Sequence, residues 1–462
     1  MSANMDMVTV TAPASKSLSH RALIAAALSR GESVVEQALE SVDIEITRRC
    51  LEAAGAVISG SGPLLRVSGF ESGPLGGGQG QYPESQDPKG KSEPVSIFVN
   101  ESGTSCRLLT AVMAVGQGTF KIHGAARMHE RPIGELAKAL EALGAKFTWL
   151  EKPGCPPFVL TASGLSGGEI SLSLEESSQY LSGLLLAAPL ARGTVTIGLS
   201  GRKAVSWPYV ALTLKVMQDH RIDFEVQLPD GNGEWNPVPW RALKKAEPGR
   251  IRFVVRPGEY DATGYRVEGD WSNGSYFLAA GAVGPRPVRV EGLHADSLQG
   301  DRAILDILGQ MGADIKTDFT GVTVSPAALR GVAVDMNRCP DLVPTVAVAA
   351  AFAQGETLIS GVPHLRIKEC DRLAAMRTQL ALAGCDIQET EDGLRIHGNG
   401  ADTLRSGRLE LSAFGDHRIA MSLSLLAFAG LDVVLDDPDC VSKSYPDFWL
   451  DWTEVAPKGG RG

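Results

Sequence analysis

The sequence predicts an α/β protein of two similar domains, each with helices packed inside curved sheets. Two interleaved repeats predict this fold. The first is an Ala- and Leu-rich stretch, then glycine, then an alternating run, and it occurs at residues 21–35, 107–122, 180–197, 276–290, 345–359 and 418–435. The second is an amphipathic helix that ends at glycine before a strand, at residues 48–58, 135–147, 304–315 and 375–387, with a looser copy at 207–224 and a weak sixth at 448–455.

The composition of the two helix types determines where each is expected to lie. The first type is apolar nearly all round and must be buried, whereas the second has one charged face and lies half exposed. The glycine after each helix suits a left-handed stop before the next strand. Six αβαβ-type units, three in each half, therefore build the two domains. A single long doubly wound sheet is the alternative, but no G-x-G-x-x-G follows the first expected strand.

Composition excludes several classes of partner. The 462 residues carry a formal net charge of -10, which argues against a nucleic-acid or anionic-membrane surface. The seven cysteines are scattered, with neither C-x-x-C nor a zinc-like His/Cys cluster, as is typical of the reducing cytosol. Residues 1–11 lack a basic segment followed by an apolar one, and the longest apolar run, around 347–353, is too short to span a membrane. We therefore expect a cytoplasmic protein with no metal site.

Three segments interrupt the repeats. Residues 71–96 are rich in Gly, Pro, Ser and Gln, which predicts a mobile surface insertion. Residues 229–250 contain Pro, Gly and Trp and are expected to form an extended loop. The tail, 457–462, is expected to be flexible.

The buried helices begin with residues suited to binding anions. Ser15, Lys16 and Ser17 precede the first helix, and the runs 102–105, 177–179 and 416–418 precede or open others. A helix N-terminus offers unpaired N–H groups and the positive end of a dipole, so phosphate or carboxylate binds there. The alternative is that these residues are only helix caps, for which Ser, Thr and Asp are favoured. Their repetition beside Lys or Arg favours an anion pocket.

Three further runs add basic residues. Residues 130–134 contain Arg131 and lead into an amphipathic helix, and residues 442–447 form a basic, turn-like segment. The run 366–372 is expected to place Lys368 and Arg372 one helical turn apart, with Glu369 beside them. Taken alone, that run is also typical of a solvated, salt-bridged helix start.

Together these motifs resemble the enolpyruvyl transferases, in the branch that acts on shikimate 3-phosphate. The resemblance runs from residue 8 to about residue 450, and its motifs lie at 14–21, 103–104, 127–132, 177–179, 366–372, 415–418 and 443–447. It implies a two-domain inside-out α/β barrel with three βαβαββ repeats per domain. One domain would span 15–267 with the insertion 71–96, and the other 1–14 plus 268–456, with crossings near 14–17 and 266–270.

The resemblance also implies the reaction and the residues that perform it. The enolpyruvyl group of phosphoenolpyruvate would pass to the 5-hydroxyl of shikimate 3-phosphate, with release of phosphate, in aromatic amino-acid biosynthesis. Shikimate 3-phosphate would be held by Lys16, Ser17, Arg21, Ser177, Ser178, Gln179, Ser206, Asp341, His364 and Lys368. Phosphoenolpyruvate would be held by Lys16, Gly103, Arg131, Gln179, Arg372, Arg418 and Lys443. A monomer is expected.

Addition followed by elimination needs a base near the hydroxyl and an acid near C3 of phosphoenolpyruvate. Asp341 is the candidate for the hydroxyl proton, and Glu369, assisted by Lys16, is the candidate for C3. Asp341 alone could instead cap a helix that begins at Leu342. No metal or organic cofactor is needed for this reaction.

Four positions depart from the usual pattern of these transferases: Glu101, Leu108, Trp271 and His364. They bear on substrate affinity and on sensitivity to glyphosate, the family's inhibitor. The sister transferase that acts on UDP-N-acetylglucosamine is one alternative, but its reactive cysteine is missing from residues 123–131. A catalytically inactive, ligand-binding paralogue is the other, although it would be expected to lose catalytic or cationic residues that this chain keeps.

Overall fold

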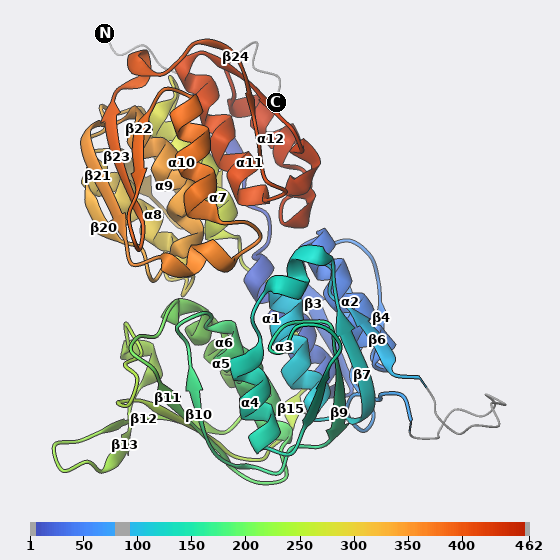
Figure 1. Cartoon of the computed structure of the whole chain (residues 1–462). Helices are drawn as coiled ribbons and strands as arrows, with labels where there is room; N and C mark the ends of the chain where they lie inside the picture. Colours follow the sequence, from blue (N-terminus) through green and yellow to red (C-terminus); the bar gives the residue numbers. More distant parts are fainter. Residues whose placement is uncertain (1–5, 79–92, 458–462) are drawn as a thin grey trace. The chain divides into compact units, whose positions relative to one another are not determined.

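The computed structural model describes residues 6–78 and 93–457 of the chain. It divides into two units: unit 1 comprises Met1–Ser15 and Glu268–Gly462, and unit 2 comprises Lys16–Val267 (Figure 1). The division follows strand pairing, because β1 (Val8–Thr11) pairs in parallel with β17 (Val288–Glu291) far along the chain. Each unit is an α/β fold of helices and mixed sheets.

The described part of unit 2 contains six α-helices: α1 (Lys16–Leu28), α2 (Val42–Ala53), α3 (Gly103–Ala114), α4 (Gly134–Ala142), α5 (Gln179–Ala187) and α6 (Trp207–Asp219). Its first strands are β2 (Ser29–Arg30), β3 (Glu32–Glu36), β4 (Val57–Ser59), β5 (Leu64–Ser68), β6 (Val95–Phe98), β7 (Gln117–His123), β8 (Lys146–Trp149) and β9 (Phe158–Ser163). The others are β10 (Gly168–Ser173), β11 (Val195–Ser200), β12 (Phe224–Pro229), β13 (Trp235–Pro237), β14 (Arg252–Val255), β15 (Tyr260–Asp261) and β16 (Gly264–Arg266).

The residues of unit 1 that the structure describes add six more α-helices: α7 (Trp271–Val283), α8 (Ile304–Met311), α9 (Val343–Phe352), α10 (Arg372–Leu382), α11 (His417–Leu423) and α12 (Phe448–Val455). Its strands besides β1 and β17 are β18 (Asp314–Thr317), β19 (Gly321–Ser325), β20 (Ala333–Asp335), β21 (Gln354–Ser360), β22 (Asp386–Glu389), β23 (Leu394–Asn399), β24 (Gly407–Leu411) and β25 (Leu431–Leu435).

One strand order recurs in both units. In unit 2 the sheets are β16-β3-β5-β4, β6-β7-β9-β8 and β10-β11-β14-β12-β13, with a short β15-β2 pair. In unit 1 they are β1-β17-β19-β18, β20-β21-β23-β22 and β24-β25. In each longer sheet the first two strands are parallel and the next pairs are antiparallel, as in β6-β7 and β7-β9. The last repeat ends in α12, and no strand follows it in the described part of the chain.

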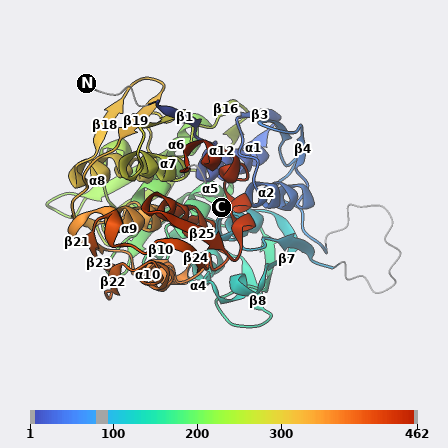
Figure 2. The same ribbon diagram turned by 90° about the horizontal axis from the view of Figure 1, so that it is seen from above.

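The two helix types lie as their composition predicts. All ten residues of α9, which carries no charge, are buried, and α9 lies against β21 and β23 (Figures 1 and 2). By contrast, only Leu136, Ala137, Ala139 and Leu140 of the nine residues of α4 are buried. Gly144 and Gly312 follow α4 and α8 with φ of 106° and 101°, so the predicted left-handed stops are confirmed at both helices.

The interruptions differ from expectation in part. Within the predicted insertion 71–96, Gly76 N donates to Gln117 O at 2.7 Å, and β6 already begins at Val95, so both ends are tied to the β7 sheet. The rest of that insertion, 79–92, lies outside the described residues, as does the tail after Pro457. The predicted loop 229–250 is partly regular, because β13 pairs antiparallel with β12.

Candidate active site

The start of α1 holds a lysine in a nearly buried ion pair. Lys16 is the first residue of the helix, and its Nζ lies 3.2 Å from Asp43 Oδ2 on α2. The two side chains are 13% and 5% exposed. The sequence placed Lys16 and Ser17 before the helix, but both lie in its first turn, where backbone N–H groups are unpaired. Lys16 is thus a cation fixed at a helix N-terminus.

Arg21, one turn further along α1, is 1% exposed and has no carboxylate partner among the described residues. Its Nε donates to Thr213 Oγ1 at 2.8 Å, and its Nη2 donates to Ser182 Oγ at 3.2 Å and Tyr209 O at 3.0 Å. Burial lowers the pKa of Arg21 to about 10. A buried guanidinium with neutral partners is costly unless an anion neutralises it. Arg21 is therefore suited to a ligand carboxylate or phosphate.

The start of α3 accommodates two guanidinium groups because its first residue is glycine. A Cβ built on Gly103 would lie 2.5 Å from Arg131 Nη2 and 2.6 Å from Arg107 Nη1. Arg131 Nη1 also donates to Glu101 O at 3.0 Å, and both arginines are 4% exposed. Two cations beside the free N–H groups of a helix start form a strong anion-binding arrangement.

Gln179, at the start of α5, is held by its neighbours. Its Oε1 accepts from Arg107 Nη1 at 3.1 Å, and its Nε2 donates to Thr104 Oγ1 at 2.9 Å. Because a guanidinium can only donate, Arg107 fixes which side of the carboxamide is oxygen. Ser177 Oγ accepts from Gln179 N at 3.2 Å, and Ser178 occupies the N-cap position of α5. The structure therefore brings Gly103, Arg131 and Gln179 together around Arg107.

Ser206 stands directly before α6 in a left-handed conformation, with φ 58° and ψ 44°. This conformation costs a residue with a side chain about 1–2 kcal/mol and is common at functional sites. Ser206 is 5% exposed. It begins the helix whose Tyr209 and Thr213 hold Arg21, so these two predicted residues share one neighbourhood.

In unit 1, Arg372 lies at the centre of a buried charge cluster. Its Nε donates to Asp416 Oδ2 at 2.7 Å, its Nη1 to Asp341 Oδ1 at 2.9 Å and its Nη2 to Glu369 Oε2 at 3.0 Å. Burial alone would lower the pKa of Arg372, but the three carboxylates outweigh burial and raise it. The guanidinium stays charged and holds all three acids in place.

Two more cations complete this cluster. Arg418 Nη2 donates to Asp341 Oδ2 at 2.9 Å, and Lys443 Nζ lies 3.6 Å from Glu369 Oε1. The five predicted residues Asp341, Glu369, Arg372, Arg418 and Lys443 are thus connected in unit 1. The carboxylates differ in access, since the side chain of Asp341 is 19% exposed, that of Glu369 11% and that of Asp416 0%.

The helical spacing expected of Lys368 and Arg372 is wrong, and the helix-cap alternative for Asp341 does not hold. Lys368 and Arg372 do not share a helix, because a 3-10 helix spans Pro363–Ile367, Lys368 is extended and α10 begins only at Arg372. Arg366 forms an ion pair with Glu389 at 2.6 Å, a contact outside this segment of the chain. Asp341 is not the cap of α9, since that position is Leu342. His364, also predicted, is 4% exposed in the same 3-10 helix.

Four polar residues were missing from the predicted site. Arg107 lies inside a buried helix pattern, and an arginine in an apolar run is the signal that identifies it. Asp43 and Asp416 hold Lys16 and Arg372, and Asp416 also caps α11 by accepting from Arg418 N. Asp301 is 5% exposed, and burial followed by the nearby Asp341 charge raises its pKa to about 7. Nothing local in the sequence separates Asp301 from a surface acid.

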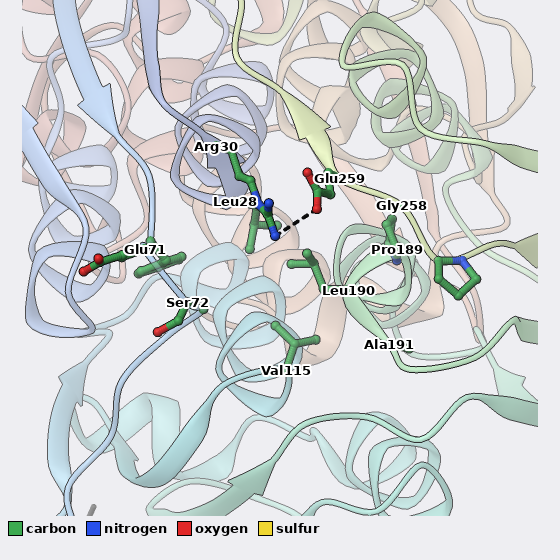
Figure 3. A pocket seen from close by; sticks show the side chains of 13 residues that line it. Leu28, Arg30, Glu71, Ser72, Val115, Pro189, Leu190, Ala191, Gly258 and Glu259 are labelled. Atoms are coloured by element: carbon green, nitrogen blue, oxygen red, sulfur yellow. Dashed lines mark ion pairs between the residues drawn. The ribbon is translucent and has the colours of Figure 1, made fainter. Parts of the chain in front are cut away.

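A cavity of about 520 Å³ lies elsewhere in unit 2 (Figure 3). Its lining includes Leu28, Val115 and Leu190, which mark the C-terminal ends of α1, α3 and α5. Two of its lining residues, Arg30 and Glu259, form an ion pair of 2.8 Å. The predicted residues lie at the N-terminal ends of the same helices, and helix C-termini disfavour anions. This cavity is therefore separate from the candidate active site.

A metal-binding cluster or a membrane-spanning helix would each indicate a further function. Across residues 6–78 and 93–457 no group of three or more His, Cys, Asp or Glu side chains is arranged to hold a metal ion. None of the helices in this part of the chain has the length and apolar character to cross a membrane.

The chain is similar to known proteins over nearly all its length. Residues 7–239 and 242–452 match the family described as EPSP synthase (3-phosphoshikimate 1-carboxyvinyltransferase). The 3-phosphoshikimate 1-carboxyvinyltransferase of Shewanella denitrificans is 37% identical over 450 residues, which cover 96% of each chain. That of Shewanella halifaxensis is 36% identical over 452 residues, covering 97% of this chain and 96% of the relative.

Solved structures share the fold. EPSP synthase from Acinetobacter baumannii superposes with a TM-score of 0.74 and 24% identity, covering 98% of this chain and 96% of that one. The enolpyruvyl transferase NikO from Streptomyces tendae superposes with a TM-score of 0.68 and 19% identity, covering 97% and 94%. The sequence match over more than nine-tenths of the chain is what decides the family: the chain belongs to the EPSP synthases, the 3-phosphoshikimate 1-carboxyvinyltransferases.

Proposed function

We propose that this enzyme transfers the enolpyruvyl group of phosphoenolpyruvate to the 5-hydroxyl of shikimate 3-phosphate and releases phosphate. The observation that carries the proposal is the set of buried cations fixed at helix starts in both units. Each substrate brings one phosphate and one carboxylate, and such anions need fixed cations and helix N-termini. The product serves the shikimate pathway, from which aromatic amino acids are made.

Shikimate 3-phosphate is held by residues at the starts of α1, α5, α6 and α9 and in the loop before α10. They are Lys16, Ser17, Arg21, Ser177, Ser178, Gln179, Ser206, Asp341, His364 and Lys368. Arg21 supports this role most directly, because its guanidinium is buried beside hydroxyl and carbonyl groups only. An anionic group of the substrate would neutralise that charge.

Phosphoenolpyruvate is held by Lys16, Gly103, Arg131, Gln179, Arg372, Arg418 and Lys443. Gly103 supports this role, because the absence of a side chain there lets Arg131 approach the free N–H groups of α3. Arginine forks match the paired oxygens of carboxylate and phosphate. The missed residue Arg107 joins the phosphoenolpyruvate set, since it supports Gln179 and faces Gly103.

The reaction proceeds in two steps. The 5-hydroxyl oxygen bonds to C2 of phosphoenolpyruvate, the hydroxyl proton leaves, and C3 gains a proton to become a methyl group. In the second step C3 loses a proton, the C2–C3 double bond reforms, and phosphate departs from C2 and takes up the proton that the hydroxyl released. Each acid or base group therefore acts once in each direction.

Asp341 accepts the proton of the 5-hydroxyl. Of the three carboxylates around Arg372, that of Asp341 is the most exposed, at 19% of its side chain. Arg372 and Arg418 each bind one of its oxygens at 2.9 Å, which fixes the orientation of the carboxylate. A positioned carboxylate of this kind contributes a factor of about 10²–10⁴ to the rate.

Glu369 exchanges the proton at C3, assisted by Lys16. Its two oxygens lie beside different cations, Arg372 and Lys443. That arrangement leaves the carboxyl group fixed while a proton moves on and off.

The finer architecture and setting complete the proposal. Each unit is a barrel turned inside out, with its apolar helices enclosed by the sheets and three βαβαββ repeats per unit, and the recurring strand order supports this. The domains are residues 15–267, and 1–14 with 268–456. The enzyme works as a cytoplasmic monomer on its two small substrates, without a metal or organic cofactor.

The test is phosphate release from phosphoenolpyruvate with shikimate 3-phosphate, compared with UDP-N-acetylglucosamine as acceptor. Phosphate release with shikimate 3-phosphate as acceptor, but not with UDP-N-acetylglucosamine, supports the proposal. Lys16→Ala and Glu369→Ala are expected to abolish turnover while the circular-dichroism spectrum stays unchanged. Phosphate release near the parent rate in either variant would contradict the assignment of these residues.

Surface ion pairs provide matched controls for both variants. Lys138 pairs with Glu135 at 2.8 Å, and Arg395 pairs with Glu356 at 3.1 Å, all on exposed side chains or nearly so. Lys138→Ala and Glu356→Ala remove the same charges without touching the proposed site. Both are expected to keep the parent turnover.

A further inference from the structure

A chain of hydrogen bonds links three helices inside unit 2. His20 Nδ1 lies 2.8 Å from Thr47 Oγ1, Thr47 Oγ1 lies 2.8 Å from Ser105 Oγ, and Ser105 Oγ donates to Ser102 Oγ at 2.7 Å. All four residues are 0% exposed. The chain runs from α1 through α2 to the start of α3, and the roles assigned above do not use it.

The direction of these bonds follows from their last member. Because Ser105 Oγ donates to Ser102 Oγ, the Thr47 hydroxyl donates to Ser105, and His20 Nδ1–H donates to Thr47. His20 Nε2 is then the unprotonated nitrogen, and it has no hydrogen-bond partner among the described residues. Each hydroxyl passes its proton toward α3, so the chain is a directed, cooperative array.

His20 is neutral in this array. Burial lowers its pKa to about 3; nearby Asp43 opposes this shift, while Lys16 and Arg21 add to it. A neutral imidazole with its proton committed to Thr47 is suited to holding two helices in register. It is poorly suited to exchanging protons at neutral pH.

The same helix faces carry the Lys16 ion pair. Lys16 and His20 are four residues apart on α1, and their partners Asp43 and Thr47 are four residues apart on α2. Residues at this spacing share one helix face. The two contacts are therefore successive rungs between α1 and α2, and the second rung continues to α3 through Ser105.

The far end of the chain lies at the start of α3. Ser102 is the N-cap of that helix, and its Oγ also accepts from Ser105 N at 3.2 Å. Gly103 follows immediately, and Arg131 and Arg107 approach it. A shift of α3 along α2 would therefore move Gly103 relative to Lys16, and both belong to the proposed phosphoenolpyruvate set.

We propose that His20, Thr47 and Ser105 are positioning residues that hold Lys16 and the start of α3 in the register that phosphoenolpyruvate binding requires. This inference rests on the proposed function. It assigns none of the three a contact with substrate. It predicts that breaking the array weakens phosphoenolpyruvate binding more than shikimate 3-phosphate binding, because Lys16 is assigned to both substrates and keeps its ion pair with Asp43, whereas Gly103 is assigned to phosphoenolpyruvate only.

The test uses variants that break the array with little change of shape. Thr47→Val removes the hydroxyl and keeps the branched side chain, whereas Thr47→Ser keeps the hydroxyl. Thr110→Val is the matched control, because Thr110 is a 0% exposed hydroxyl on α3 that donates only within its helix, to Cys106 O at 2.7 Å. KM for each substrate, kcat and the melting temperature are measured on all three and on the parent.

Thr47→Val is expected to raise KM for phosphoenolpyruvate at least five-fold and KM for shikimate 3-phosphate less than two-fold. Thr47→Ser and Thr110→Val are expected to stay within two-fold of the parent for both. If Thr47→Val fails to fold, Ser105→Ala is used in its place. That substitution removes the hydroxyl that links α3 to α2, while the backbone N–H of residue 105 can still donate to Ser102 Oγ. If KM for phosphoenolpyruvate is the same in Thr47→Val (or Ser105→Ala) as in Thr110→Val, this inference is wrong and the proposed function is unaffected. A parent without turnover would instead overturn the proposed function.

Discussion

Gly103 and Arg131 occupy the same small space at the start of α3, where a Cβ on the glycine would lie 2.5 Å from Arg131 Nη2. Arg107 Nη1 is nearly as close, at 2.6 Å from that Cβ position. The glycine is therefore a requirement of the two guanidinium groups. Its backbone conformation does not demand glycine, because its φ is not in the left-handed region.

Replacing Gly103 with alanine is expected to displace the guanidinium of Arg131 and leave the fold intact. The clashing atoms are ends of flexible side chains, so they move at small cost to stability. We expect KM for phosphoenolpyruvate to rise several-fold and the melting temperature to change by less than about 2 °C, within the range of mild substitutions. Steady-state kinetics and thermal unfolding measure the two effects.

Gly231→Ala is the control for that substitution, because a Cβ there meets nothing within 4 Å. It is expected to match the parent in both measurements. A Gly103→Ala enzyme with unchanged KM for phosphoenolpyruvate would show that Arg131 does not need its observed position.

Arg372→Lys is expected to damage both stability and catalysis. One ammonium cannot replace a guanidinium that binds Asp416, Asp341 and Glu369 at once. Asp416 is 0% exposed, so losing the paired guanidinium contacts leaves a buried carboxylate poorly compensated, which costs up to about 3–5 kcal/mol. We expect kcat/KM to fall at least about 100-fold, since the two proposed proton-transfer groups lose their anchor.

Arg289→Lys is the matched comparison in unit 1, because Arg289 pairs with the exposed acids Asp318 and Glu291. Exposed pairs contribute about 0–1 kcal/mol. Urea unfolding and turnover should therefore be nearly unchanged in that variant. Equal losses in the two variants would contradict a special role for Arg372.

Periodicity predicted the buried helices well, because an apolar surface all round a helix has only one stable environment. The helix starts were also predictable, since Ser102 and Asp416 cap α3 and α11 through local bonds to Ser105 N and Arg418 N. The pairing of β1 with β17 was implied only by the family resemblance. No local pattern in residues 8–11 points to a partner so far along the chain.

Tertiary contacts explain where the sequence was misleading. Lys368 and Arg372 have helical spacing, yet the chain is extended at Lys368. The ion pair of Arg366 with Glu389 on β22 supplies a competing long-range contact, and it is invisible in a local pattern. The approach of Arg131 to Gly103 is likewise a product of packing, since Gly103 and Arg107 lie on α3 and Arg131 comes from the loop before α4.

His20 is expected to make the free energy of unfolding depend on pH, and a His20 variant separates this effect from that of other groups. The folded protein has the lower pKa, about 3 against 6.5, so the unfolded chain binds more protons between those values. The contribution of neutral His20 to the free energy of unfolding is therefore fully present above pH 6.5 and is lost as the pH falls toward 3. Relative to His20→Asn, which can still donate to Thr47 but does not titrate, the parent should lose about 2 kcal/mol more between pH 7.5 and pH 5. Urea unfolding measures the free energy at each pH. An equal change in the two proteins between pH 7.5 and pH 5 would contradict this prediction.

Asp301 is expected to show the opposite dependence. Burial, followed by the charge of Asp341, raises the pKa of Asp301 from 3.8 to about 7. The folded protein therefore binds more protons than the unfolded chain between pH 3.8 and 7, and stability present at low pH is lost as the pH rises through 7. Asp301→Asn keeps an oxygen that can accept from Ser272 but cannot ionise.

The Asp301→Asn variant should gain up to about 4 kcal/mol over the parent on going from pH 4 to pH 8, measured by urea unfolding. Asp341→Asn provides the internal control. Because Asp341 contributes to the raised pKa, removing its charge should reduce the effect of Asp301→Asn on the pH dependence of stability. If that effect is the same with and without the Asp341 charge, the two carboxyl groups do not interact, and burial alone accounts for the shift.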